Sequence, residues 1–216
     1  MTGIWDDWLT HHDQLLSGLW TSLRLTFMAL LLGLPAGLLL AIGTSSRRRA
    51  LRGSVVILVE IGRGTPALVL LQIVYNGIPV TLTAFICAYI ALALTTAAYT
   101  SEILRAGLQA VPRGEIEAGH ALGMSSAHVL RDVVIPQGIR IALPPLLGFC
   151  ILMFQATSLA FVIAVPELTS QAKSIANNTF HYFNLFIIAG VLYAVITISA
   201  SFATEQLEKR LHRQHA

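Results

Sequence analysis

Charged residues are scarce in this chain of 216 residues, where Asp, Glu, Lys and Arg together make up 12% of the sequence. Soluble domains carry roughly twice that fraction. Hydrophobic residues make up 55% of the sequence, and the mean hydropathy is +0.71. This composition excludes an ordinary soluble domain and is typical of an integral membrane protein.

The sequence also lacks the residues that carry most enzyme chemistry. Its two cysteines, Cys87 and Cys150, lie inside apolar stretches and form neither a metal pair nor an exposed disulfide framework. The seven histidines show no metal-ligand spacing. No G-x-x-x-x-G-K-[ST] phosphate-binding loop occurs, and neither does a G-x-S-x-G or an H-E-x-x-H motif. We therefore expect no catalytic residue, no metal and no cofactor in this chain.

Long apolar stretches dominate what is present, and a helix needs about 20 such residues to cross a bilayer. The stretches cover residues 15–42, 54–76, 80–99, 141–165 and 184–204, with a turn at residues 76–79. We expect an all-α polytopic membrane protein with five transmembrane helices. Its single membrane domain spans residues 15–204, preceded by an extracytoplasmic segment at 1–14 and followed by a cytoplasmic tail at 205–216.

The first stretch carries a row of small residues at four-residue spacing. They are Ala29, Gly33, Gly37 and Ala41. Residues at this spacing lie on one face of a helix, and a face without large side chains lets two helix backbones approach closely in lipid. We expect this face to pack against another helix.

Positive charges predict the orientation of the chain in the membrane. Four Arg follow the first stretch, four lie within residues 100–140, and three Lys and Arg lie in the tail. With five spans these regions share one side, which the positive-inside rule makes cytoplasmic. The placement of these residues beside apolar stretches argues for topology and against nucleic-acid binding. Residues 1–14 contain three Asp and no Lys or Arg, unlike the basic start of a cleaved signal peptide.

Residues 100–140 form a polar region that is too hydrophilic to span a bilayer. Pro112 and Gly114 are suited to opening a helix, whose first turn then holds Glu115 and Glu117 at the positive end of its dipole. Gly123 is expected to end that helix.

A second helix is expected directly after the glycine. Ser125 is a good N-cap for it, and Pro136 should end it and turn the chain back to the membrane. The first helix would present Ile116, Leu122 and Met124 beside the Glu117 carboxylate. A partner could bury that apolar edge, or the loop could pack on its own membrane domain, and the spacing alone leaves both open.

The polar region contains Glu117-Ala118-Gly119, then Gly123, and after a further stretch Ile135-Pro136. This pattern resembles the EAA coupling loop in membrane subunits of binding-protein-dependent ABC importers. Segments spread along nearly the whole chain are similar to the polar amino acid branch of these permeases. They are Glu60-Ile61-Gly62-Arg63-Gly64-Thr65-Pro66, residues 98–107, Val111-Pro112-Arg113-Gly114, residues 121–125, Ile135-Pro136-Gln137 with Arg140, residues 143–146, and Thr157-Ser158-Leu159.

The resemblance implies a type I ABC importer fold with a helix-turn-helix coupling loop between helices 3 and 4. It implies a permease that moves a polar amino acid across the bacterial inner membrane. ATP and Mg²⁺ would be used by a pair of separate ATPase subunits. The other partners would be an extracytoplasmic solute-binding protein, membrane lipid and a second permease subunit, identical or similar. The residues implied in ATPase coupling are Gly114, Glu117, Ala118, Gly119, Leu122, Gly123 and Pro136.

The sequence departs from the family pattern at a few positions. Gly119 replaces the second Ala of the motif, which should loosen the coupling helix by up to about 1 kcal/mol. Ile135 replaces a Leu before the proline. Phe149 stands where the family often has Asn, and Ala156 where it often has an acidic or amide residue. The last two changes remove polar groups near the expected pathway.

Polar residues inside or beside the spans are candidates for the substrate pathway, because they are costly in lipid and so face protein or water. They are Glu60, Arg63, Thr65, Gln72, Gln155, Thr157, Ser158 and Glu167. Each has a structural alternative. Glu60 and Arg63 can neutralise each other at a break near Gly64 and Pro66. Hydroxyls often bond to their own helix, and Glu167 can cap the next segment instead of meeting a substrate ammonium.

Two other classes of function are alternatives to an importer subunit. A membrane scaffold or sensor could use the polar region to bind a cytoplasmic partner without transport. An intramembrane enzyme would need a paired catalytic constellation, which the sequence lacks.

Overall fold

The computed structural model describes residues 3–46, 48–77 and 82–213, which are helical or in short turns. Residues 1–2, Arg47, residues 78–81 and residues 214–216 lie outside the described part. Half of the expected turn at 76–79 and the start of the third expected span therefore fall on residues that the structure does not describe. The elements in chain order are α1 Ile4–Thr44, α2 Arg49–Gly64, α3 Ala67–Gly77, α4 Ala84–Gln109, α5 Arg113–Ala121, α6 Ser126–His128, the π-helix η1 Val129–Val134, α7 Ile135–Ala156, the 3-10 helix η2 Thr157–Ile163, α8 Leu168–Thr179 and α9 Tyr182–Arg213.

The described helices account for the expected spans. Four of them are long and apolar enough to cross a membrane alone, and the bent pair α2–α3 makes a fifth if counted as one span. The two helices of that pair meet at 105°. The predicted interruption near Gly64 and Pro66 is thus confirmed, because α2 ends at Gly64 and α3 begins at Ala67.

The small-residue face of α1 packs against α4, as expected. A Cβ atom added at Gly33 would lie 2.9 Å from the carbonyl oxygen of Ala93, and one at Gly37 would lie 2.9 Å from that of Ala97. Both would also overlap a threonine side chain of α4. The backbones of α1 and α4 therefore approach as closely as glycine allows, which anchors the first span to the centre of the molecule.

Helices extend beyond the apolar stretches at several ends. α1 begins at Ile4 instead of residue 15, the fourth candidate span begins at Ser126 instead of residue 141, and α4 and α9 continue past their expected last residues. α4 continues to Gln109 because its polar end is neutralised within the helix by an ion pair between Glu102 and Arg105. α9 likewise continues to Arg213, with an ion pair between Lys209 and Glu205 on its surface. The polar segment between the last two spans, which the pattern left undefined, forms α8.

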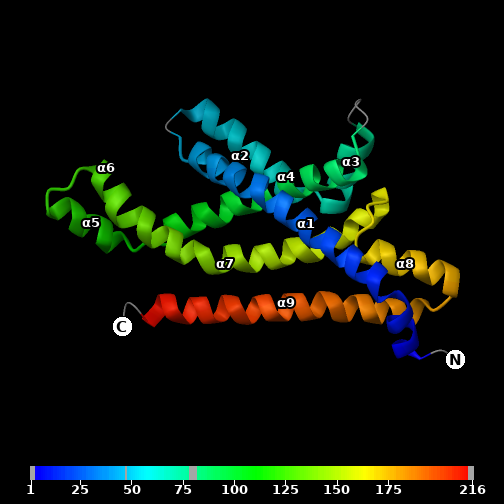
Figure 1. Ribbon diagram of the computed structural model, residues 1–216. Helices are drawn as coiled ribbons and strands as arrows, with labels where there is room; N and C mark the ends of the chain where they lie inside the picture. The colour runs from blue at the N-terminus through cyan, green and yellow to red at the C-terminus, as the bar shows by residue number, and fades with distance from the viewer. Residues whose placement is uncertain (1–2, 47, 78–81, 214–216) are drawn as a thin grey trace.

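The elements divide the molecule into two ends (Figure 1). α5, α6 and the C-terminal end of α9 lie at one end, and the connection from α1 to α2 lies toward the same end. The N-terminus and α8 lie at the opposite end. The regions that carry most of the positive charge therefore gather at one end, which agrees with the expected topology.

Candidate functional site

The helix α5 forms where the sequence places its start and stop signals. Pro112 is its N-cap residue and Glu115 lies in its first turn. Gly123 has a φ of +79°, a left-handed conformation that glycine adopts without strain. The backbone N–H of Met124 then donates to the Gly119 carbonyl at 3.1 Å. The expected glycine stop is confirmed.

One face of α5 is buried against the following helical segment. Gly119 is buried, and a Cβ atom there would lie 3.0 Å from Cγ2 of Val129. Ile116 and Met124 pack on a small cluster formed by Val111, Val129 and Val134. Of the two alternatives left open for this apolar edge, packing within the chain is what the structure shows for the half-buried Ile116 and Met124.

The other face of α5 is open. Glu117 and Ala118 are exposed on it, and Gly114 and Gly123 are exposed at its two ends. Leu122 follows the last turn and is 83% exposed, the highest value among the large hydrophobic residues of the described chain. An exposed leucine beside a carboxylate offers an apolar anchor and a charged group to a contact with another protein.

Pro136 does not end the second helix, contrary to expectation. Ser125 caps that helix as expected, accepting from the backbone N–H of His128 at 3.4 Å. α6, η1 and α7 then follow without a break, so the helix runs from Ser126 through Pro136 into the membrane. The six residues before α7 form a π-helix, whose wider turn shifts the carbonyls that a proline ring would meet in an α-helix. The segment α6–η1 is therefore continuous with the long apolar helix of a candidate span.

Two ion pairs lie side by side where α2 meets α4. Arg63 lies 3.3 Å from Glu60, and the Nε atom of Arg105 donates to Glu102 at 2.9 Å. Glu60, Glu102 and Arg105 line a polar cavity of about 440 Å³. Sequence reasoning missed Glu102 and Arg105 as site residues, although their three-residue spacing, the same as that of Glu60 and Arg63, was a usable signal.

Arg63 is held by an aromatic stack as well as by Glu60. Its guanidinium lies 5.9 Å from the ring centroid of Tyr99, and that ring stacks on Phe149 at 5.3 Å. The Tyr99 hydroxyl donates to the Arg63 carbonyl at 3.3 Å. The structure thus shows the structural alternative for Glu60 and Arg63, an ion pair at a helix break, and gives Phe149 a packing role.

The neutral polar candidates mostly bond within their own segment. Thr65 donates to the Ile61 carbonyl at 2.7 Å, and the buried Thr157 donates to the Phe154 carbonyl at 2.6 Å. The Gln72 side-chain oxygen accepts from Asn76 at 2.7 Å.

Two further polar candidates, Gln155 and Ser158, lie at the end of α7 and in η2. Gln155 is exposed and Ser158 is half-buried. They flank Thr157, where the helix tightens from α to 3-10 geometry. These two side chains have the accessibility that a substrate contact needs.

Glu167 is fully buried and caps α8. Its carboxylate accepts from the backbone N–H groups of Thr169 at 2.9 Å and Ser170 at 2.7 Å, and from the Tyr193 hydroxyl at 2.8 Å. Burial raises the pKa of this carboxyl above its ordinary value, although these hydrogen bonds oppose the rise. The capping alternative is what the structure shows. Within the described residues, no group of three His, Cys, Asp or Glu side chains is arranged to hold a metal ion.

Comparison with known proteins assigns the family. A model of the family described as "Binding-protein-dependent transport system inner membrane component" matches residues 33–213. The chain belongs to this family of ABC importer permeases. The match includes α5, both ion pairs and all the candidate pathway residues.

Two relatives and one solved structure support the assignment. The chain is 34% identical to a probable amino-acid ABC transporter permease of Bacillus subtilis, over 90% of this chain and 88% of the relative. It is also 34% identical to the histidine/lysine/arginine/ornithine permease HisM of Salmonella typhimurium, over 95% of this chain and 93% of that protein. A crystal structure of an amino acid ABC transporter with histidines matches with a TM-score of 0.93 and 36% identity, over 97% of this chain and all of that chain. These matches confirm the resemblance and the type I importer fold.

Proposed function

We propose that this permease carries a polar amino acid into the cell and is driven by a separate ATPase that docks on α5. The observation that carries the coupling proposal is the divided surface of α5. One face holds Gly119 against Val129, and the other exposes Leu122 and Glu117. A partner could bury the Leu122 side chain in an apolar pocket and place a cation or an amide against the Glu117 carboxylate.

The connection from α5 to the membrane supports a role in force transmission. The buried face of α5 packs on η1, and η1 continues into α7 without a break. A displacement of α5 would therefore move the beginning of a transmembrane helix. Coupling requires that the docked helix bind the ATPase in each conformational state of the permease.

The substrate is assigned to the amino acids through the relatives, whose names specify amino-acid transport. The accessible polar groups at the junction of α7 and η2, Gln155 and Ser158, are the candidates for contact with the amino and carboxylate groups. Gln72 lies on α3, which packs on η2, and is the third candidate through its side-chain nitrogen, which the hydrogen bond from Asn76 does not use. The other five candidates would act by shaping the pathway. Glu60 and Arg63 form an ion pair with each other, and the hydroxyls of Thr65 and Thr157 and the carboxylate of Glu167 already have hydrogen-bond partners within the chain.

The orientation that we propose places α5 and the C-terminus in the cytoplasm and the N-terminus outside. It is supported by the concentration of Lys and Arg at the α5 end of the molecule. In this orientation an ATPase pair that uses ATP and Mg²⁺ contacts α5. A solute-binding protein meets the α8 end, and a second permease subunit completes the pathway.

Reconstitution tests the proposal. The permease is purified with its ATPase and placed in vesicles, with a solute-binding protein and labelled amino acids on the outside. The proposal predicts ATP-dependent accumulation of one or a few polar amino acids and stimulation of ATP hydrolysis by loaded binding protein. A complex that assembles but shows neither effect would instead support a scaffold or sensor.

A further inference from the structure

An apolar groove runs beside the α1–α2 connection, at the end of the molecule that carries α5. It has a volume of about 510 Å³ and is bounded by the last turns of α1, the end of α4, and the junction of η1 with α7. Its walls include Leu38, Ile42, Leu104, Leu130 and Ile139. The groove is thus built from the ends of membrane spans.

The groove opens to the surroundings of the protein. Leu38, Leu130 and Ile139 are each 50% exposed, and Ile42 is 62% exposed. None of the residues that line it belongs to α5, so the proposed ATPase contact leaves it accessible. An exposed aliphatic groove at this depth is suited to a hydrocarbon chain.

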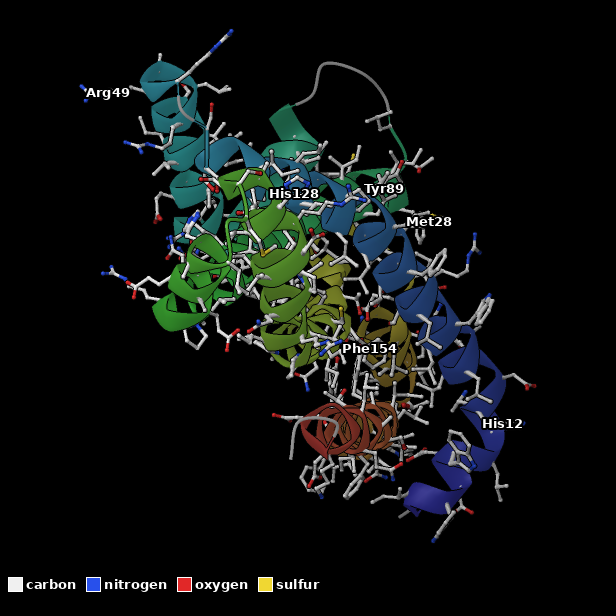
Figure 2. All side chains as sticks on the ribbon, turned by 90° about the vertical axis from the view of Figure 1, so that its left-hand side faces the viewer. His12, Met28, Arg49, Tyr89, His128 and Phe154 are labelled. Carbon is white, nitrogen blue, oxygen red and sulfur yellow. The ribbon has the colours of Figure 1, made fainter. Side chains whose placement is uncertain are left out.

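Three guanidinium groups lie next to the groove. Arg48 directly precedes α2 and Arg49 is its first residue, close in sequence to Ser46 and Leu51, which line the groove. Arg52 lines the adjoining polar cavity, which shares Ser45 with the groove. All three are exposed, and Figure 2 shows Arg49 pointing outward from the start of α2.

These arginines differ from those of the nearby ion pairs. Arg63 and Arg105 are each paired with a glutamate on the same helix. The side chains of Arg48, Arg49 and Arg52 form no ion pair with any residue in the described part of the chain. Their positive charge is available to an external anion next to an apolar surface.

We propose that this groove binds an anionic phospholipid of the inner leaflet, with an acyl chain against Ile42 and Ile139 and the phosphate beside Arg48, Arg49 and Arg52. The proposal rests on the orientation given above, which places this end in the cytoplasm. Charge complementarity selects an anionic over a zwitterionic lipid, because basic residues near the membrane surface attract anionic headgroups.

The bound lipid would contact two elements of the molecule at once. Ile42 belongs to α1, whereas Leu130 and Ile139 belong to the continuous segment that carries α5 into the membrane. An acyl chain between them contacts both walls and stabilises their present separation. The site therefore makes the coupling segment sensitive to the lipid composition of the inner leaflet.

Photo-crosslinking of lipid tests the site without requiring transport. A photoreactive phenylalanine analogue replaces Ile42 in the groove or, as a matched control, Leu39, which is 70% exposed on the same helix but does not line the groove. Each whole complex is placed in phosphatidylcholine vesicles containing either labelled phosphatidylglycerol or labelled phosphatidylcholine. We expect the groove position to prefer phosphatidylglycerol and the control position to label both lipids equally.

Charge variants complete the test. Replacing Arg48, Arg49 and Arg52 with Gln should lower the phosphatidylglycerol preference at Ile42 by at least about tenfold, because each basic residue contributes to attraction of the headgroup. Replacing the same three residues with Lys should retain most of it. Equal labelling of the two lipids at Ile42, an unchanged preference in the Gln variant, or crosslinking to another protein subunit in place of lipid would overturn the proposal. None of these outcomes depends on whether the complex transports an amino acid.

Discussion

The two ends of the molecule satisfy their polar groups in different ways. At the α8 end, the Glu167 carboxylate is fully buried and receives hydrogen bonds from two backbone N–H groups and from Tyr193. Asp7 is 5% exposed there and accepts from His181 and Asn184, each at 2.7 Å. These bonds connect α1, α8 and α9 within one chain, so the buried carboxylates at this end have their hydrogen-bond partners within the chain.

The α5 end has a thin core and an open surface. Its local cluster contains Val111, Val129 and Val134, whereas Leu122 and Glu117 project outward. The buried carboxylates of the α8 end are satisfied within the chain, whereas the exposed face of α5 offers a surface for another protein. Changes at the α8 end should lower fold stability, and changes on the open face of α5 should affect assembly.

The largest expected effect on stability comes from replacing Glu167 with Ala. The change leaves two backbone N–H groups and the Tyr193 hydroxyl without their acceptor, at a cost of about 3 kcal/mol. Thermal unfolding of the purified variant and of the unmodified protein measures this loss of stability. Glu205→Ala serves as the control, since its ion pair with Lys209 is exposed and contributes less than about 1 kcal/mol. Equal stability of the two variants would contradict the capping role of Glu167.

A smaller loss is expected from Asp7→Asn. The amide keeps the size of the side chain but can accept from only one of His181 and Asn184 in place of both, at a cost of about 1–2 kcal/mol. The matched change Asp13→Asn alters a side chain that is 96% exposed and should leave the unfolding temperature unchanged. A variant of Asp7 as stable as that control would show that the buried network is dispensable.

Gly119→Ala should change stability by less than about 1 kcal/mol, because a gain in helix propensity opposes crowding by Val129 at 3.0 Å. At Gly114 an added Cβ would meet nothing within 4 Å, so Gly114→Ala shows the propensity gain without the contact. The free energies of unfolding of the two variants are each compared with that of the unmodified protein. If Gly119→Ala stabilises as much as Gly114→Ala, the close approach of α5 to η1 has no energetic consequence.

Glu117→Arg is expected to have the smallest effect on the fold, within about 0.5 kcal/mol, because the side chain is exposed. It should weaken co-purification with the ATPase, since a cation replaces the carboxylate on the docking face. Glu117→Gln should weaken it less. Asp13→Arg, at the other end, should not weaken it at all. If the Glu117→Arg variant co-purified normally with the ATPase, Glu117 would not be part of the interface.

Much of the fold follows from patterns that the sequence displays directly. Apolar length predicted the spans, four-residue spacing predicted the contact of α1 with α4, and Gly64 with Pro66 predicted the break between α2 and α3. Each is a local pattern with one dominant physical cause. The coupling motif was recognised in the same way, from residues close together in sequence.

The one wrong prediction and the alternatives left open lie where tertiary contacts or the surrounding backbone decide the outcome. Ile116 and Met124 lie on an apolar edge that suits either a partner or a local core, and only the position of Val129 distinguishes these. Pro136 normally ends a helix, but the π-helix before it removes the clash. Glu167 accepts hydrogen bonds from its own helix and from Tyr193, 26 positions away. Its sequence context alone therefore does not distinguish a helix cap from a substrate contact.

Amide hydrogen exchange compares both ends in one experiment. The permease is measured alone and in the assembled complex with its ATPase. We predict slower exchange in the complex within residues 113–124, which include α5, and unchanged exchange within α8. Unchanged protection of residues 113–124, or an equal gain at both ends, would contradict the claim that α5 is the surface completed by the ATPase.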